Sequence, residues 1–250
     1  MLQLKNIAVT LGRGTTLERK VLSGLNLAVP KGEFIVVIGG NGAGKSTMFE
    51  MISGFVKPQS GCIILDGEDV TSQPQTLRAR SIARVLQDPR LGTMENMTIF
   101  ENLAFALNRG KTRAFKLFSS NARRQLFAEK LFALDMGLEN RLDEVTGNLS
   151  GGQRQALSLI MAILADSKVL LLDEITAALD PKTAKKVMKL ANTIVRSEGK
   201  TCLMITHSME QALEYGDRTL ILKGGKFIKE YRNTEKKMLS PEQLAAAFEA

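Results

Sequence analysis

Nine consecutive residues near the start of the chain have the types and spacing that suit a site for a chain of phosphates. The nine are Gly39, Gly40, Asn41, Gly42, Ala43, Gly44, Lys45, Ser46 and Thr47, and the first eight fit the pattern G-x-x-x-x-G-K-S/T. Glycines let the backbone curl so that successive amide groups point at phosphate oxygens. We expect Lys45 to reach the β and γ phosphates, Ser46 to offer its hydroxyl to Mg²⁺, and Thr47 to support a neighbouring phosphate. The alternative is a merely flexible glycine turn.

Two acidic residues follow a short apolar run further along the chain. Residues 169–172 predict a buried strand, and Asp173 and Glu174 stand at its carboxyl end, where ligands bind in open α/β sheets. We expect Asp173 to hold Mg²⁺, directly or through water, and Glu174 to orient and polarise an attacking water. The alternative is that the two acids cap the following turn.

A glycine pair opens a predicted helix between these two motifs. Ser150, Gly151, Gly152 and Gln153 follow Leu149, and the Ser and Gln fit a capping box. Capping does not call for two glycines, each of which costs about 1 kcal/mol relative to alanine inside a helix. Close approach of the backbone to an anion does call for them. We therefore expect a second anion contact here.

The elements that position these motifs follow an α/β pattern. Residues 34–38 predict a buried strand that runs into the glycine-rich turn, and a helix follows from Lys45. Similar strands at 169–172, 203–205 and 220–222 are separated by helical patterns, which predicts a largely parallel sheet. Apolar alternation before residue 33 predicts a small antiparallel β layer.

The strand pattern disappears between about residues 90 and 148. Thr98 and Glu101 fit a capping box, and a second helical pattern follows around Leu131. We expect one domain over 1–250, with an inserted helical subdomain at about 90–148 and a loosely organised tail at about 224–250 that ends in a helix capped by Ser240.

Composition narrows the class of protein. No apolar run approaches the roughly 20 residues needed to cross a bilayer, so the chain is not expected to form a channel itself. The amino terminus lacks a secretory pattern, so we expect the chain to stay in the cytoplasm. Cys62 and Cys202 predict buried reduced thiols. The net charge of +8 permits nucleic acid, anionic lipid or nucleotide as partner and does not choose among them.

With the motifs in this order, the sequence resembles the ABC ATPase family over essentially the whole chain. The string from Leu149 to Gln153 is similar to that family's LSGGQ signature, which binds the γ phosphate held by the other subunit's phosphate loop. The resemblance implies a P-loop NTPase core with a mostly parallel sheet. It also implies ATP and Mg²⁺ as cofactors and an ATPase activity.

The resemblance assigns three further residues. Gln87 matches the Q-loop glutamine, which would touch Mg²⁺ or the water, although a Gln before Asp-Pro is by itself an ordinary turn. Asp180 matches the D-loop at the dimer seam and also fits a helix N-cap before Pro181. His207, the only histidine, matches the switch histidine that contacts the γ phosphate. The catalytic residues implied are Lys45, Gln87, Glu174 and His207.

The resemblance further implies a homodimer that works on a separate membrane permease, at the inner face of the cell membrane. Residues 84–93, 157–162 and 176–184 are similar to a bacterial uptake group allied to branched-chain amino-acid importers. We therefore expect uptake of an amino acid or similar small metabolite, with an extracytoplasmic solute-binding protein in the same system. The alternative is an ABC-type ATPase of DNA repair or translation. The sequence has neither the coiled-coil heptads typical of the DNA-associated relatives nor the second cassette typical of the translation-associated ones, which argues against that alternative. We therefore expect no nucleic-acid partner.

Some positions depart from the family's usual residues, and one basic segment has no role that the resemblance assigns. Residues 9–12 contain no aromatic residue to stack on adenine, so Leu11 is expected to pack there, while Ile175 and Ala177 replace a common proline and serine without removing a needed group. A basic segment comprises Arg109, Lys111, Arg113, Lys116, Arg123 and Arg124. It is either a solvated face or a contact for lipid headgroups or a channel loop.

Overall fold

The computed structural model describes residues 1–110 and 120–249, and contacts divide the chain into two compact units. The first unit comprises residues 1–78 and 198–250, and the second comprises residues 79–197. The helical insertion expected at about 90–148 falls inside the second unit, and the tail at about 224–250 falls inside the first. A single domain over 1–250 stays a prediction.

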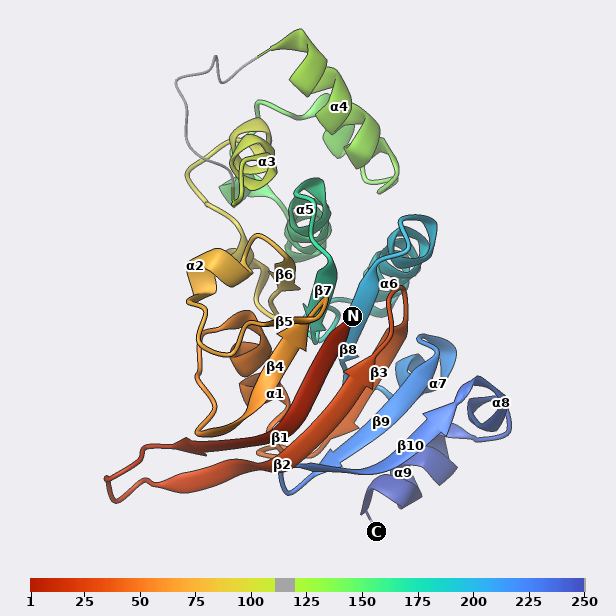
Figure 1. The fold of residues 1–250 in the computed structure, drawn as a ribbon. Coiled ribbons are helices and arrows are strands. Elements are labelled where there is room, and N and C mark those ends of the chain that lie inside the picture. Colours follow the sequence, from red (N-terminus) through yellow and green to blue (C-terminus); the bar gives the residue numbers. More distant parts are fainter. Residues whose placement is uncertain (111–119, 250) are drawn as a thin grey trace. The chain divides into compact units, whose positions relative to one another are not determined.

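The first unit contains an antiparallel sheet in the order β2-β1-β4-β5. Its strands are β1 (Leu2–Leu11), β2 (Arg19–Val29), β4 (Ser60–Leu65) and β5 (Glu68–Asp69). Leu25, Leu27 and Val29 are buried while the residues between them are exposed, which is the alternation of a strand with one face on the core. β1 and β2 continue beyond the other strands as a two-stranded ribbon (Figure 1). The predicted antiparallel layer is confirmed.

The same unit contains a second set of strands in the order β10-β9-β3-β8. These are β3 (Phe34–Gly39), β8 (Thr201–Ile205), β9 (Arg218–Lys223) and β10 (Lys226–Arg232). β3 lies parallel to both β8 and β9, and every residue of β3 is buried. The parallel arrangement predicted from the apolar runs is confirmed for β3, β8 and β9.

β10 corrects the prediction of a loosely organised tail. It pairs antiparallel with β9, but in the middle of the strand Lys229 and Glu230 are exposed and Tyr231 is buried. Such an edge strand is held by its ladder of backbone hydrogen bonds and one packed face, so it lacks the apolar run that marks a central strand. The helix capped by Ser240 is confirmed, since its hydroxyl accepts from Gln243 N at 3.3 Å.

Five helices belong to the first unit among the described residues. They are α1 (Lys45–Ser53), α2 (Gln75–Arg78), α7 (Met209–Glu214), α8 (Asn233–Lys236) and α9 (Pro241–Glu249). α1 buries Met48, Met51 and Ile52 and is capped by Gly54, whose φ of 86° is the left-handed conformation of a helix cap.

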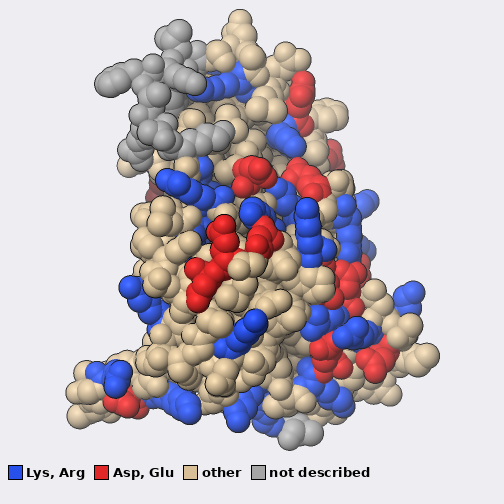
Figure 2. All heavy atoms as spheres, viewed as in Figure 1, with Lys and Arg blue, Asp and Glu red and all other residues tan. Residues whose placement is uncertain are grey.

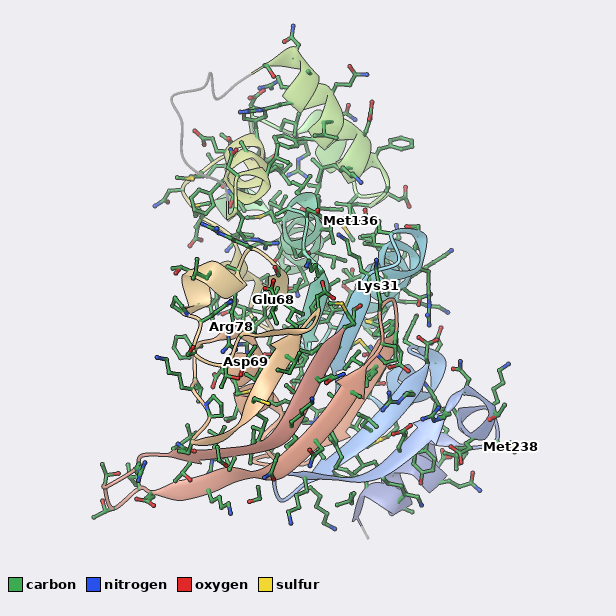
Figure 3. The ribbon with its side chains drawn as sticks, viewed as in Figure 1. Lys31, Glu68, Asp69, Arg78, Met136 and Met238 are labelled. Carbon is green, nitrogen blue, oxygen red and sulfur yellow. The ribbon has the colours of Figure 1, made fainter. Side chains whose placement is uncertain are left out.

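Arg78, labelled in Figure 3, fixes the carboxyl end of α1. Its side chain is 1% exposed, and its guanidinium donates to Met51 O at 2.6 Å, Ile52 O at 3.0 Å and Thr71 O at 2.7 Å. The end of a helix leaves carbonyl groups without intrahelical partners, and Arg78 satisfies two of them. Burial lowers the pKa of this guanidinium.

The second unit combines two parallel strands with most of the longer helices. Its strands are β6 (Ile82–Val85) and β7 (Val169–Asp173), and its α-helices are α3 (Ile99–Leu107), α4 (Asn121–Phe132), α5 (Gly151–Leu164) and α6 (Pro181–Ser197). Short 3-10 helices lie at η1 (Pro89–Gly92), η2 (Leu138–Asn140) and η3 (Thr146–Asn148). No strand occurs in 90–110 or 120–148, so the helical insertion is confirmed for the part of the chain that the structure describes.

α3 begins with the predicted capping box. Thr98 Oγ1 accepts from Glu101 N at 3.2 Å, and a Glu101 side-chain oxygen accepts from Thr98 N at 2.7 Å. α3 packs on α4 through Phe100 and Phe127, whose ring centroids are 5.3 Å apart. Within residues 1–110 and 120–249, no helix is both long enough and apolar enough to cross a membrane.

Two further predictions concern the two cysteines and the basic segment. Cys202 is buried in β8, but Cys62 on β4 is only half-buried, and both are free thiols. In the basic segment, Arg124 pairs with Asp143 and lies 5.2 Å from the centroid of the Phe100 ring, so it is engaged within the chain. Lys111, Arg113 and Lys116 lie outside the described residues. On the face drawn in Figure 2, basic and acidic side chains are interspersed.

Candidate functional site

The phosphate loop connects β3 to α1 and is built around glycines with special conformations. Gly44 precedes α1 with a φ of 104° and makes no side-chain cap hydrogen bond. A Cβ at Gly44 would lie 2.7 Å from Leu22 Cδ2, so β2 packs where any larger residue would sit. The amides of the first turn of α1 therefore lack the usual side-chain acceptor, and an anion would supply one.

Lys45 is held inside this loop. It is 6% exposed, and its Nζ donates to Gly39 O at 2.7 Å and to Gly40 O at 3.1 Å. The turn between β9 and β10 supports the loop from the other side, because Gly225 N donates to Ala43 O at 3.2 Å. The ammonium group is thus positioned by the loop backbone before any phosphate binds.

His207 lies at the same edge of the strands as the phosphate loop. β8 runs parallel to β3, with Ile205 opposite Val37, so His207 follows the end of one strand as Gly39 ends the other. The side chain is exposed. Its neighbour Thr206 fixes the turn, since Thr206 Oγ1 donates to Gln211 Oε1 at 2.8 Å and accepts from Ser208 N at 3.1 Å. The predicted strand-end position of His207 is confirmed.

The region expected to face the base is also in the first unit. Leu11 ends β1 opposite Arg19, the first residue of β2. A Cβ at Gly42 would lie 3.9 Å from Arg19 Nη1, so this guanidinium borders the phosphate loop. A cation therefore stands beside the position that lacks an aromatic side chain.

The carboxylate pair belongs to the second unit, where it stands at the carboxyl end of β7. β6 and β7 are parallel, with Val85 opposite Leu172, so Gln87 and Asp173 both come at the carboxyl ends of these strands. Gln87 is exposed, and the preceding Leu86 O accepts from Gln155 Nε2 at 3.1 Å. The structure thus brings Gln87 and the carboxylates to one edge, as expected for parallel strands.

Asp173 and Glu174 have distinct surroundings. Asp173 is 6% exposed and pairs with Arg84 on β6. Glu174 has a φ of +48°, a left-handed conformation that costs an unbranched non-glycine residue on the order of 1–3 kcal/mol. Ala177 N donates to Glu174 O at 3.0 Å, so the tight turn after β7 holds this conformation in place.

The glycine pair at the start of α5 serves two purposes. The capping box is present, with Ser150 Oγ accepting from Gln153 N at 3.3 Å and Gln153 Oε1 accepting from Ser150 N at 3.1 Å. A Cβ at Gly152 would lie 2.3 Å from Thr183 Cγ2, so this glycine allows α5 to approach α6. A Cβ at Gly151 would meet nothing within 4 Å. Packing thus accounts for Gly152 and leaves Gly151 unexplained.

Asp180 begins α6 as the N-cap predicted. Its Oδ1 accepts from Thr183 N at 3.1 Å, and this hydrogen bonding to Thr183 lowers the pKa of the Asp180 carboxyl. Beside it is a cavity of about 280 Å³ lined by Met136, Ser150, Gln153, Lys182, Thr183 and Lys186. The start of α5 is therefore open to solvent on a side that carries lysines.

Arg84 is the residue of this site that sequence reasoning missed. It is a charged residue inside the short strand β6, and a charge in such a strand calls for a partner. The sequence therefore indicates that Arg84 needs a partner, but only the register of β6 against β7 shows that this partner is Asp173.

These two edges together define the class of protein. A strand, a glycine-rich loop and a helix that starts with a buried lysine form a phosphate site, and a second strand ends in a carboxylate pair, as in P-loop nucleotide hydrolases. Residues 22–177 match the sequence family described as ABC transporter. The chain belongs to the ABC transporter family. It is the ATP-binding subunit of such a transporter, and its activity is that of an ATPase.

Two relatives show how far this similarity extends. The tyrosine transport ATP-binding protein of Clostridioides difficile (strain R20291) is 42% identical over 249 residues, which cover 100% of this chain and 99% of the relative. The methionine import ATP-binding protein of Haemophilus ducreyi is 36% identical over 254 residues, which cover 99% of this chain and 70% of the relative. The predicted family and transport function are confirmed, and the DNA-repair or translation alternative is set aside.

Solved structures agree on the fold. A dimeric ATP-binding cassette in a post-hydrolysis state with ADP and Pi is 29% identical, with a TM-score of 0.80, and the match covers 93% of this chain and 99% of that one. An ATP-binding cassette in its ADP conformation is 26% identical, also with a TM-score of 0.80, and the match covers 100% of this chain and 99% of that one. The predicted ABC ATPase fold is confirmed.

Proposed function

We propose that this chain powers the uptake of an amino acid or a similar small solute through a separate membrane permease. The observation that carries the proposal is the 42% identity to a tyrosine transport ATP-binding protein, because it extends over the whole of both chains. The relation to a methionine import ATP-binding protein points to the same class of solute. An extracytoplasmic solute-binding protein is proposed as the component that selects the solute.

The nucleotide is proposed to bind through the phosphate loop. The loop amides from Gly39 to Gly44 and the first turn of α1 would surround the phosphates, and Lys45 would contact the β and γ phosphates. The geometry fits a phosphate chain, since Gly44 supplies no cap and Lys45 is already directed into the loop. Ser46 and Thr47 would contact the metal and a neighbouring phosphate.

Mg²⁺ is proposed to be held by Ser46, Gln87 and Asp173. Among residues 1–110 and 120–249 there is no cluster of three or more His, Cys, Asp or Glu that could form a complete metal cage. This suits Mg²⁺, which keeps several waters and takes one or two carboxylates together with substrate phosphates. When bound, the metal neutralises charge on the phosphates.

The catalytic roles fall on residues with matching surroundings. Glu174 would orient and polarise the attacking water, and its left-handed backbone places it in the tight turn directly after β7. His207 would contact the γ phosphate from the exposed end of β8. Hydrolysis depends on such positioning more than on covalent chemistry.

Two copies are proposed to bind ATP head to tail. Ser150, Gly151, Gly152, Gln153 and Asp180 of one copy would contact the nucleotide held by the phosphate loop of the other. The open surroundings of Gly151 support this arrangement, since its backbone can approach an anion without obstruction. A related cassette has been solved as a dimer after hydrolysis.

The permease is proposed to contact the segment that follows Gln87. Leu91, Met97 and Phe105 are 74%, 39% and 49% exposed, and exposed apolar side chains within one segment are candidates for a contact with another protein. They lie on η1, before α3 and on α3, within the second unit. Contact with a permease would place the chain on the inner face of the cell membrane, in the cytoplasm.

Reconstitution tests the proposed function. The chain, its permease and the solute-binding protein are assembled in proteoliposomes, and uptake of labelled tyrosine or methionine is measured with and without internal ATP. We expect uptake that requires ATP and is lost with Glu174→Gln. ATP hydrolysis without uptake of any amino acid tested would refute the proposed solute class, and failure to associate with the permease would refute the proposed contact with it.

A further inference from the structure

Arg84 and Asp173 form an ion pair that the register of two strands builds into the second unit. Arg84 Nη2 lies 2.5 Å from Asp173 Oδ2, and the two side chains are 19% and 9% exposed. Arg84 stands opposite Leu171, two residues before Asp173 on the same face of β7. The pairing of β6 with β7 therefore places the guanidinium at the carboxylate.

Burial makes this pair important to Asp173. A buried carboxylate without a cation is costly, because water cannot solvate it. Among the described residues, the structure gives Asp173 no cationic partner other than Arg84. Arg84 is thus the group that neutralises Asp173 when no metal is present.

Arg84 itself is incompletely satisfied and has room to move. Its Nε is buried without a hydrogen-bond partner among the described residues. A cavity of about 180 Å³ adjoins it, lined by Arg84, Gly92, Phe105, Ala106, Arg109, Ser158, Met161 and Ala162. Arg109 is already engaged there, since its Nη2 donates to Ala162 O at 3.0 Å. The hydroxyl of Ser158 lines the same cavity and is an acceptor that a displaced guanidinium could use.

We propose that Arg84 is the counter-ion of Asp173 in the metal-free protein and competes with Mg²⁺ for this carboxylate. This inference rests on the metal role proposed for Asp173. A divalent cation and a guanidinium at one carboxylate repel each other, most strongly where burial limits screening. Binding of the metal therefore releases Arg84 from Asp173.

Release of Arg84 links the metal site to the segment that carries Gln87. Arg84 lies on β6, and Gln87 follows the end of this strand. Between them, the Leu86 carbonyl accepts a hydrogen bond from Gln155 of α5. Breaking the Arg84 contact removes one side-chain restraint between β6 and the end of β7, while the backbone ladder of the two strands remains. Occupancy by metal thus changes the restraint on Gln87.

Metal titration of variants tests the proposal. Arg84→Gln is saturated with a non-hydrolysable ATP analogue, and Mn²⁺ binding is followed by electron paramagnetic resonance, with Mg²⁺ as competitor. We expect the metal concentration for half-saturation to fall by about three- to tenfold, because a competing charge is gone. The unfolding temperature without metal should fall as well, because Asp173 loses its partner. Arg90→Gln is the matched control, since Arg90 pairs with Asp88 in an exposed setting.

The alternative outcomes are separable. An unchanged or higher half-saturation concentration in Arg84→Gln would overturn the proposal, since it would show that Arg84 assists the metal or ignores it. If that variant does not fold, Arg84→Met decides, since it keeps the length of the side chain and removes the charge, and no fall there would overturn the proposal. Asp173→Asn should weaken metal binding, and unchanged binding there would instead refute the metal role proposed for Asp173.

Discussion

The Nζ of Lys45 lies 2.7 Å from the carbonyl oxygen of Gly39, six residues earlier in the chain. This contact closes the phosphate loop on itself and holds a buried ammonium group where phosphates are expected. The loop is consequently organised by its own backbone and by the glycines that let β2 pack against it. Preorganisation of this kind lowers the cost of binding an anion.

Replacement of Lys45 by alanine should weaken nucleotide binding. A hydrogen bond to a charged group contributes about 1.5–3 kcal/mol, so the dissociation constant should rise roughly 10- to 150-fold. Titration with a fluorescent ATP analogue measures it. Lys57→Ala, at an exposed position after α1, serves as control and should bind as the unmodified chain does. Equal affinity in the two variants would rule out the phosphate role of Lys45.

Replacement of Glu174 by glutamine should separate binding from hydrolysis. A positioned general base contributes on the order of a hundredfold or more, so the rate of phosphate release should fall by at least that factor. Binding of ATP should be unchanged, since glutamine keeps the size of the side chain. Glu68→Gln, at an exposed position on β5, is the control. Hydrolysis at the original rate in Glu174→Gln would remove Glu174 from the mechanism.

The two glycines of α5 should respond differently to alanine. Gly152→Ala would force a Cβ to within 2.3 Å of Thr183 Cγ2, and overpacking of this kind costs about 1–3 kcal/mol. Gly151→Ala should keep the unfolding temperature of the original chain, because its Cβ would meet nothing, but should lose ATPase activity if its backbone approaches the partner's nucleotide.

A second substitution checks the packing half of this prediction. Thr183→Ala removes the methyl group that a Cβ at position 152 would meet, so adding it should restore the stability of Gly152→Ala. Thermal unfolding of the single and double variants measures the effect. No recovery in the double variant would mean that the close approach of α5 and α6 is not what requires Gly152.

Loss of Arg78 should destabilise the first unit without touching the phosphate loop. Arg78→Met removes the guanidinium donor from the carbonyls of Ile52 and Thr71, while Met51 O keeps Gly54 N at 3.2 Å, and each buried unsatisfied group costs about 1–3 kcal/mol. The free energy of unfolding in urea should fall by several kcal/mol, against no change for the exposed Arg13→Ala. A loss below about 1 kcal/mol would show that water replaces these contacts.

The parts of the fold that the sequence predicted are those encoded by neighbouring residues. The phosphate loop, the capping boxes at Thr98 and Ser150, and the apolar strand β3 depend on residue types within a few positions of one another. β10 was not predicted because it is an edge strand whose side chains are mostly exposed, so it shows no apolar run. The N-cap at Asp180 was predicted because aspartate before proline is a local pattern.

The relations that escaped prediction join residues distant in the chain. Arg84 and Asp173 meet only through the pairing of β6 with β7, and Gly152 meets Thr183 only through the packing of α5 on α6. Periodicity gives the face of a strand or helix but not the partner it meets. The role of Gly152 in packing therefore became evident only in the structure.

The most direct test of the account is the mass of the Glu174→Gln protein in solution. With ATP and Mg²⁺, light scattering should report twice the mass of the 250-residue chain, because each nucleotide would join one phosphate loop to the other copy's Gly151. Without nucleotide, or with Lys45→Ala added, it should report a single chain. A single-chain mass at saturating ATP, with nucleotide binding confirmed, would contradict the shared site on which the proposed function depends.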